Sequence, residues 1–475
     1  MSKKVAVIGL DCATPQFLFN GWRNLLPNLS RLIEGGVWGE LESTLPPITV
    51  PAWTSMMTGL DPGELGFYGF RNRKDYSYDA LYFANASYLR AETVWTHLGR
   101  SGLRSILLGI PQTYPPRPLK GCLVGCFLTP SKEAAYTYPP GLKKEIDELA
   151  GGDYIIDVRD FRTNDKDRLL RQVYEMTERR FKVARGLLQR KSWDFFMMVE
   201  MGTDRIHHGF WRFGDRAHRL YEPGNPYEHA IRDYYVYLDG EIGKLLEVLP
   251  KDCTVLVVSD HGAKTMHGGV CINDWLIREG YLALKQPLEN GPTKFRLDMV
   301  DWPNTTAWGE GGYYSRIFLN VAGREPQGRI PAADHERVRD ELKAKLEAMP
   351  GPDGAPLGTR AFKPEEVYRA CRNIPPDLIV YLGNLDWRSV GSLGNPDIFT
   401  FENDTGPDDA NHAEQGIFIM ANLDGSGPRG RREGLTIYDI APTLLDLFGQ
   451  KVPPQLRGTP IRQEVPAPGS GRQPA

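Results

Sequence analysis

Short, unbroken runs of apolar residues recur along the chain and predict strands that are buried on both faces. The clearest runs occupy residues 5–9, 195–199, 254–258 and 417–420. They are continuous rather than alternating, and alternation is what marks a strand with one side facing solvent. We therefore expect these four runs to lie inside one covered sheet.

Apolar residues at helical spacing fill the stretches between these runs. One predicted helix follows a cap at Thr163 or Asn164, and a second occupies residues 227–249. Strands that alternate with helices predict an α/β fold in which a mostly parallel central sheet is sandwiched by helices. Ligand sites in such folds gather at the carboxyl ends of the strands, so we expect the functional polar residues there.

The less regular segments predict insertions into this core. Residues 80–160 are rich in Tyr, Pro and Gly and read as an excursion, while residues 286–404 are expected to form an inserted cap subdomain. The core would then comprise residues 1–285 and 405–462. The Pro- and Gly-rich residues 463–475 are expected to be a disordered tail.

Composition narrows the class of protein without choosing a function. A chain of 475 residues is long enough for one large domain with insertions. A net charge of -3 gives no signature of a nucleic-acid partner, and no apolar run approaches the roughly 20 residues needed to cross a bilayer. Six scattered cysteines, with Cys122 and Cys126 read as buried apolar side chains, fit reduced thiols. We expect a cytoplasmic protein with a small-molecule substrate and leave its oligomeric state open.

Three carboxylates follow three of the apolar runs. Asp11 comes after VAVIGL, Asp204 after FFMMVEMGT and Asp260 after TVLVVS, so all three should emerge at one edge of the sheet. Histidines accompany them at His208, His261 and His412. Carboxylate and imidazole groups are common metal ligands. Taken alone, each acid is equally well explained as a cap and each histidine as a structural residue. His207 competes with His208 for the role of metal ligand.

Thr49 lies in a Pro-rich turn that leads into an apolar helix, in the segment STLPPITVPAWTSMMTG. Its hydroxyl should stand near the amino-terminal end of that helix, where backbone amides favour a phosphate. An ordinary N-cap threonine is the alternative for this position taken alone.

Together, the order and spacing of these segments resemble the type I phosphodiesterase and nucleotide pyrophosphatase branch of the alkaline phosphatase superfamily. VAVIGLD, TVPAWTSMMTGLDPGELG, GTDRIHHGFW, VVSDHG and NHAEQGIFIM carry the likeness. The resemblance implies that one divalent ion is held by Asp204, His208 and His412 and a second by Asp11, Thr49, Asp260 and His261. Zinc suits these ligands, with manganese or iron as alternatives.

The resemblance also implies a reaction. Thr49 would be the covalent nucleophile, and phosphodiester or nucleotide pyrophosphate bonds would be hydrolysed through a phospho-threonine intermediate. A phosphomonoesterase on the same site and a metal-binding relative without turnover are the alternatives. A sulfatase would need a C/S-x-P-x-R segment, which TVPAW does not provide.

Two positions depart from the branch. Many of its members carry His and Asn after the nucleophile helix, where this chain has Leu65 and Phe70. The phosphate contact made by that Asn could pass to a backbone amide or to Arg71, Asn72 or Arg73, and the role of the extra imidazole of His267 is open. A diester also needs a wall for its second substituent, for which the candidates are Phe67, Tyr68, Phe70, Trp302 and Trp308.

Overall fold

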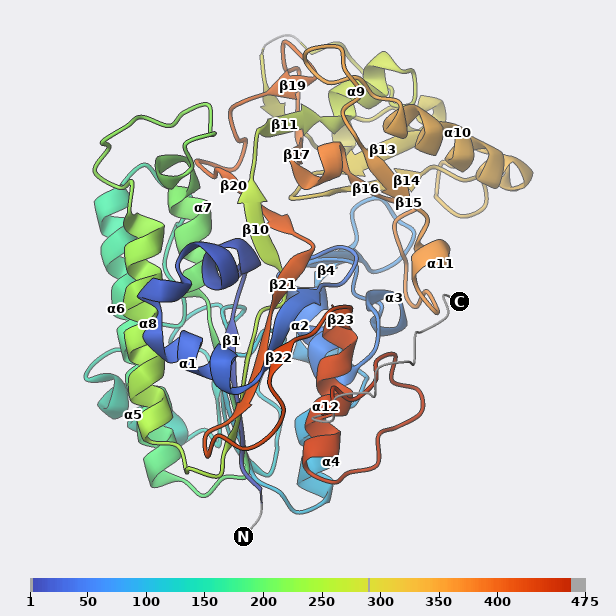
Figure 1. Cartoon of the computed structure of the whole chain (residues 1–475). Coiled ribbons are helices and arrows are strands. Elements are labelled where there is room, and N and C mark those ends of the chain that lie inside the picture. The colour runs from blue at the N-terminus through green and yellow to red at the C-terminus, as the bar shows by residue number, and fades with distance from the viewer. Residues whose placement is uncertain (1–2, 289–290, 463–475) are drawn as a thin grey trace, which may run out of the picture.

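A large mixed sheet with a parallel centre organises the main lobe (Figure 1). The computed structural model describes residues 3–288 and 291–462, so the predicted tail at 463–475 lies outside the described residues. At the centre, β1 (Val5–Leu10) pairs in parallel with β8 (Phe195–Glu200) on one side and β9 (Thr254–Val258) on the other. These three strands coincide with predicted apolar runs and are buried along their whole length, which confirms the α/β fold with a covered sheet.

The outer strands of this sheet are partly antiparallel. The predicted run at 417–420 lies within β21, which is antiparallel to both of its neighbours, β9 and β2. Residues 80–160 were predicted to be an excursion, yet they contribute β5, β6 and β7 to the sheet. The outer strands are β5 (Ser105–Leu108), β6 (Gly121–Val124), β7 (Thr137–Tyr138), β21 (Gln415–Asn422), β2 (Val37–Glu42), β22 (Gly430–Arg431) and β23 (Leu435–Thr436).

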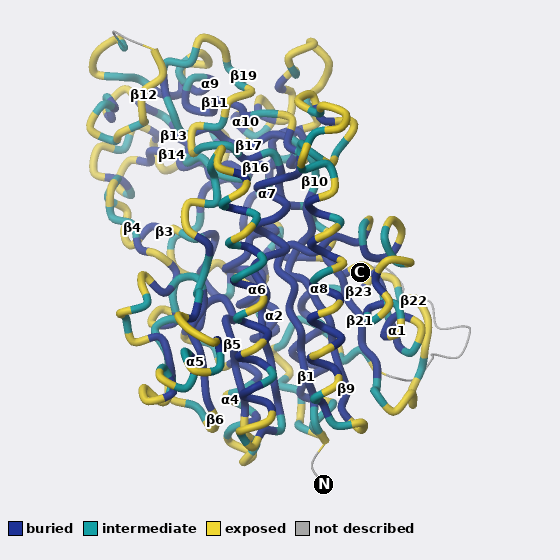
Figure 2. The backbone as a smooth tube through the Cα atoms, turned by 90° about the vertical axis from the view of Figure 1, so that its left-hand side faces the viewer, coloured by how far each residue is buried: buried dark blue, intermediate teal, exposed yellow. Residues whose placement is uncertain are grey.

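Helices cover both faces of the main sheet, and the exposed positions of this lobe lie on their outer sides and in the loops (Figure 2). The long α6 begins after Asp165, whose side chain accepts from the Arg168 amide, so the cap lies one residue past the predicted Asn164. One face carries α1 (Pro27–Gly35), α5 (Leu142–Ala150), α6 (Lys166–Arg190), α7 (Gly202–Gly214) and α8 (Ala230–Glu247). The other carries α2 (Thr49–Thr58), α3 (Pro62–Leu65), α4 (Val94–Arg100) and α12 (Ile440–Leu447).

A smaller lobe with its own apolar core sits at the carboxyl-end edge of the central strands (Figure 1). Its core extends from Val270 to Trp387, so the predicted cap boundary at residue 286 falls inside it; the division into core and cap stays a prediction. A four-stranded antiparallel sheet lies at its centre, made of β13 (Ala307–Glu310), β14 (Ser315–Leu319), β16 (Leu378–Tyr381) and β15 (Arg360–Phe362). Beside it lie α9 (Ile272–Arg278), α10 (His335–Glu347), α11 (Pro364–Val367), β11 (Gly268–Cys271), β17 (Trp387–Val390) and β19 (Phe399–Thr400).

Short two-stranded pairs complete the fold. β10 (Gly262–Thr265) and β20 (Ala410–Ala413) form an antiparallel pair that brings the segments after β9 and before β21 together. The other pairs are β3 (Arg71–Arg73) with β4 (Leu81–Phe83) and β12 (Thr293–Lys294) with β18 (Ser392–Leu393). Within the described part of the chain, none of the helices has the length and apolar character needed to cross a membrane.

Candidate metal centre

The carboxyl ends of the three central strands bring the predicted carboxylates together. Asp11 follows β1, Asp260 follows β9, and Asp204 lies in the first turn of α7 after β8. All three are buried, and side-chain atoms of Asp11, Asp260 and His261 lie within 4.8 Å of one another. A second group with the same spacing contains Cys12, Asp204 and His208. The parallel register of the strands is therefore what assembles the cluster.

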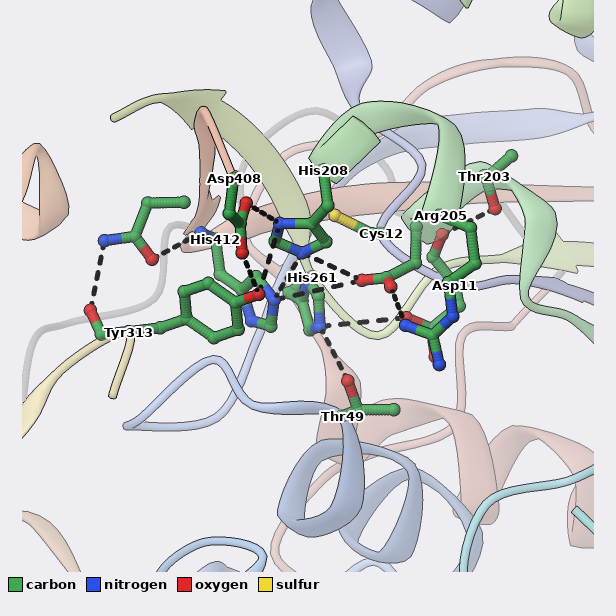
Figure 3. A network of polar contacts seen from close by, with 12 residues as sticks. Asp11, Cys12, Thr49, Thr203, Arg205, His208, His261, Tyr313, Asp408 and His412 are labelled. Carbon is green, nitrogen blue, oxygen red and sulfur yellow. Dashed lines mark hydrogen bonds and ion pairs between the residues drawn. The ribbon is translucent and has the colours of Figure 1, made fainter. Parts of the chain in front are cut away.

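The three predicted histidines turn the same ring nitrogen, Nε2, toward this cluster (Figure 3). His208 Nε2 lies 3.2 Å from Asp204 Oδ1 and 3.3 Å from His412 Nε2. His261 Nε2 lies 3.2 Å from Asp260 Oδ2. The structure thus gathers residues from α7, from the end of β9 and from β20 into one site, although His412 follows His261 by 151 residues and His208 by 204 in sequence.

The opposite ring nitrogen of each histidine faces an oxygen acceptor outside the cluster. The acceptors are Asp408 Oδ1 at 2.7 Å for His208, Gly262 O at 3.1 Å for His261, and Pro47 O at 2.8 Å for His412. An Nδ1–H that donates to these oxygens leaves Nε2 with its lone pair directed inward. This is the arrangement in which neighbouring groups orient metal-binding histidines.

The helix α2 supplies both Thr49 and a contact that holds Asp11. Thr49 is the first residue of α2, and its Oγ1 lies 3.3 Å from His261 Nε2. One turn later Trp53 donates from Nε1 to Asp11 Oδ2 at 2.7 Å. This indole packs so closely on β1 that a Cβ at Gly9 would lie 2.5 Å from it. The first amides of the helix, from Thr49 and Val50, meet no backbone carbonyl among the described residues, so they remain donors for an anion.

The electrostatics of the cluster fit divalent cations. Burial and the neighbouring Asp204 raise the pKa of Asp11, and burial together with Asp11 raises the pKa of Asp260. Across the described residues, Asp11 Oδ1 and Asp260 Oδ2 are buried without a hydrogen-bond partner. Buried carboxylate oxygens are costly unless a donor or a cation meets them. Unpartnered carboxylate oxygens beside inward-facing imidazole lone pairs form the donor set that zinc-type ions bind.

Asp408 is a residue of the site that the sequence analysis missed. Its carboxylate is buried, meets His208 Nδ1, and also accepts from the Tyr313 hydroxyl at 2.8 Å and Arg162 Nε at 2.9 Å. With no ion bound, burial lowers the pKa of His208, but Asp408 and Asp204 outweigh burial and raise that pKa to about 9. A cation that binds Nε2 therefore displaces a proton from it. Because 200 residues separate Asp408 from His208, no local spacing in the sequence could have paired them.

The remaining imidazoles near these motifs point elsewhere. His207 is fully buried beside Phe17 and Trp211, with Nε2 3.1 Å from the Tyr235 hydroxyl, and burial lowers its pKa to about 3. His267 is exposed, and its ring lies 6.5 Å from that of Trp387. Of the two competing histidines in GTDRIHHGFW, His208 is therefore the one that the fold turns toward the carboxylates.

A cavity of about 1310 Å³ opens beside the cluster and is lined by both lobes. Thr49, Asp204, His208 and His412 form part of its wall. Of the aromatic residues expected to receive a second substituent, Phe70 and Trp308 line it. Phe67, Tyr68 and Trp302 do not line it and pack within the apolar cores.

Of the three polar side chains considered for the phosphate contact, one lines the cavity and two do not. Arg71 is exposed and lines the cavity. Asn72 lies outside the lining, where its amide accepts from Tyr68 N and donates to Gly69 O. Arg73 is buried against Glu325, with NH1 3.0 Å from the carboxylate. Asn72 and Arg73 thus serve local structure, and we no longer assign them to substrate.

Solved structures with the same architecture show the fold class. Murine ectonucleotide pyrophosphatase/phosphodiesterase 5, an inactive variant in complex with AMP, is 13% identical with a TM-score of 0.55, over 95% of this chain and 96% of that one. Phosphonoacetate hydrolase from Sinorhizobium meliloti, in complex with phosphonoformate, is 16% identical with a TM-score of 0.60, over 94% and 95%. These likenesses show the fold alone, a mixed α/β architecture with a large central sheet flanked by helices.

The family follows from the sequence itself. Residues 5–408 match the family described as type I phosphodiesterase / nucleotide pyrophosphatase, and the chain belongs to this family. It is a hydrolase of that type. None of the curated proteins compared with the chain matches it. The family match ends before His412, which the β10–β20 pair nevertheless brings into the cluster.

Proposed function

We propose that the protein hydrolyses phosphoric esters, with phosphodiester or nucleotide pyrophosphate bonds as substrates, at a centre of two divalent metal ions. One ion would be held by Asp204, His208 and His412. The other would be held by Asp11, Thr49, Asp260 and His261. The observation that carries this assignment is the convergence of three Nε2 lone pairs with carboxylate oxygens that lack a donor among the described residues.

Zinc is the ion we propose, because three imidazoles and three carboxylates suit it, and manganese or iron could use the same ligands. When bound, such ions lower the pKa of a coordinated hydroxyl and offset the charge of a phosphoryl group. A cytoplasmic location rests on the sequence alone and stays a prediction.

Thr49 is the proposed nucleophile. Its Oγ1 loses a proton and forms a bond to phosphorus, while the bond from phosphorus to the leaving oxygen breaks and that oxygen gains a proton. The amides at the start of α2 donate to the phosphoryl oxygens during this step. Water then replaces Thr49 on phosphorus and restores the hydroxyl. The position of Thr49 supports this role, because Thr49 is the first residue of α2, lines the cavity, and has its Oγ1 3.3 Å from His261 Nε2.

A comparison of two model esters tests the substrate class. We expect kcat/KM to be higher for bis(nitrophenyl) phosphate than for nitrophenyl phosphate under the same metal and pH, because Phe70 and Trp308 offer apolar wall for a second substituent. The ratio reports differential stabilisation of the two transition states. A clear preference for the monoester would overturn the diesterase assignment in favour of a phosphomonoesterase on the same site. Absence of turnover with any metal, despite binding of two ions, would favour a binding protein.

Asp408 gives a prediction about metal affinity. Asp408→Asn keeps the shape of the side chain but removes the charge that meets His208, so we expect the affinity for one of two ions to fall by about 10- to 100-fold. Competition with a metal indicator dye measures this. Asp409→Asn is the matched control, because Asp409 is the next residue and its carboxylate instead lies 3.5 Å from Arg212 Nε. Equal affinities in the wild type and Asp408→Asn would show that Asp408 does not orient His208.

A further inference from the structure

Arg205 stands beside the candidate centre and has no role in the scheme above. It follows Asp204 directly in α7, and its side chain is only 8% exposed. It lines the same cavity as Thr49 and His208. Figure 3 shows its guanidinium on the side of the cluster away from Tyr313, and its positive charge lowers the pKa of Asp11 against the effect of burial. A permanent positive charge is therefore fixed at the edge of the space that an ester attacked by Thr49 would occupy.

The guanidinium is held rigidly by its surroundings. Asp157 accepts from Nε at 3.0 Å and from NH2 at 2.6 Å, and Asp204 Oδ2 accepts from NH1. The rings of Phe161 and Phe127 lie 4.5 and 5.8 Å from its central carbon. An arginine has five N–H groups, so these three bonds leave two of them for another acceptor. A planar donor pair in a fixed orientation matches the oxygens of a phosphoryl group.

We propose that Arg205 binds the non-bridging oxygens of the phosphoryl group that Thr49 attacks. The inference rests on the function proposed above. Asn72 and Arg73 are committed to local structure, and Arg71 is exposed on the cavity wall. Arg205 combines a fixed position on the same cavity wall as Thr49 with N–H groups that meet no acceptor among the described residues.

The charge of Arg205 has a consequence for specificity. The phosphoryl group of a monoester is a dianion, whereas that of a diester is a monoanion. A fixed cation stabilises the dianion more, since Coulomb energy scales with charge. Loss of Arg205 should therefore harm monoester hydrolysis more than diester hydrolysis, whichever ester the wild type prefers.

A purely structural role makes a different prediction. If Arg205 only held Asp204, its loss would release a metal ion and would lower the hydrolysis of every ester by the same factor. Metal content and the ratio between substrates therefore separate the two roles. Asp157→Asn adds a third test, because it loosens the guanidinium without removing its charge.

The experiment compares Arg205→Met, Arg205→Lys, Asp157→Asn and the wild type, each loaded with zinc. Elemental analysis gives the metal content, calorimetry gives the affinity for inorganic phosphate and for dimethyl phosphate, and kcat/KM is measured on the two nitrophenyl esters. Lys294→Met is the matched control, because it removes one positive charge from an exposed position on the same cavity wall. Guanidinium ion is added to Arg205→Met to test chemical rescue.

In Arg205→Met we expect two ions per chain, affinity for inorganic phosphate reduced by about 10- to 100-fold, and a smaller loss for dimethyl phosphate. Arg205→Lys and Asp157→Asn should lie between Arg205→Met and the wild type, and added guanidinium should recover part of the loss. Lost metal, equal losses for both anions, or an equal effect in Lys294→Met would overturn the proposal. If Arg205→Met fails to fold, Arg205→Lys tests the proposal through the same comparison, namely whether its loss of affinity is larger for inorganic phosphate than for dimethyl phosphate. Phosphate binding that depends on Arg205 without ester turnover would instead contradict only the proposed hydrolysis.

Discussion

Thr49→Ala is expected to lower kcat by on the order of 10³-fold or more, because only binding and electrostatic stabilisation remain when the nucleophile is lost. The fold should survive, since the hydroxyl makes one side-chain contact in the described structure, to His261 Nε2 at 3.3 Å. Initial rates on purified, metal-loaded protein measure the loss, and circular dichroism checks the fold. Two ions per chain should remain bound, or nearly so.

Two further substitutions sharpen this test. Thr49→Ser keeps a hydroxyl at the start of α2 and should retain part of the rate. Thr54→Ala removes a hydroxyl from the same helix that bonds only to the Val50 carbonyl, at 2.6 Å, so its kcat should stay close to that of the wild type. Wild-type activity in Thr49→Ala would transfer the attack on phosphorus to water.

Removal of the metal ions is the second change with a large expected effect. A chelator should abolish activity and lower the thermal midpoint of unfolding, because ions bound only to the native state stabilise it by mass action. The stabilisation is about 4 kcal/mol per site at a free ion concentration a thousand times the dissociation constant. The unpartnered oxygens of Asp11 and Asp260 in the emptied cluster act in the same direction. Zinc or manganese should restore both activity and stability.

The chelation experiment has a control and a partner variant. The same chelator saturated with zinc beforehand should have no effect. His208→Ala should reduce the ion count from two per chain to one, whereas His207→Ala should keep both ions, because His207 packs against Tyr235 instead. Full activity with no more than one ion per chain would contradict the two-ion scheme. Loss of metal from His207→Ala alone would reverse the choice between the two histidines.

The strands at the parallel centre of the fold could be predicted from the sequence, because the apolar run that forms each strand is a short continuous segment. An unbroken apolar run followed by an acid predicts both the strand and the edge at which Asp11 and Asp260 emerge. The fold adds what spacing could not give, namely the register that sets β1 between β8 and β9. The strands β5 and β6 escaped prediction because each has only four residues and Pro- and Gly-rich sequence lies between them.

Contacts between side chains that are far apart in the sequence could not be predicted. Asp408 meets His208, and Asp157 fixes Arg205 from a loop 48 residues away. Such pairings depend on how the loops at one sheet edge fold over each other, and no periodicity encodes them. The same limit explains Asn72 and Arg73, whose position after the nucleophile helix favoured a substrate contact. Tertiary packing instead turned Arg73 toward Glu325.

The central claim is that Thr49 bonds to phosphorus during turnover, and the stereochemistry of the reaction tests it most directly. A phosphorothioate diester that is chiral at phosphorus is hydrolysed in ¹⁸O-labelled water, and the configuration of the product is determined by ³¹P NMR. Two successive in-line displacements, first by Thr49 and then by water, each invert the phosphorus, so the account predicts net retention. Net inversion would mean a single displacement by water and would contradict it.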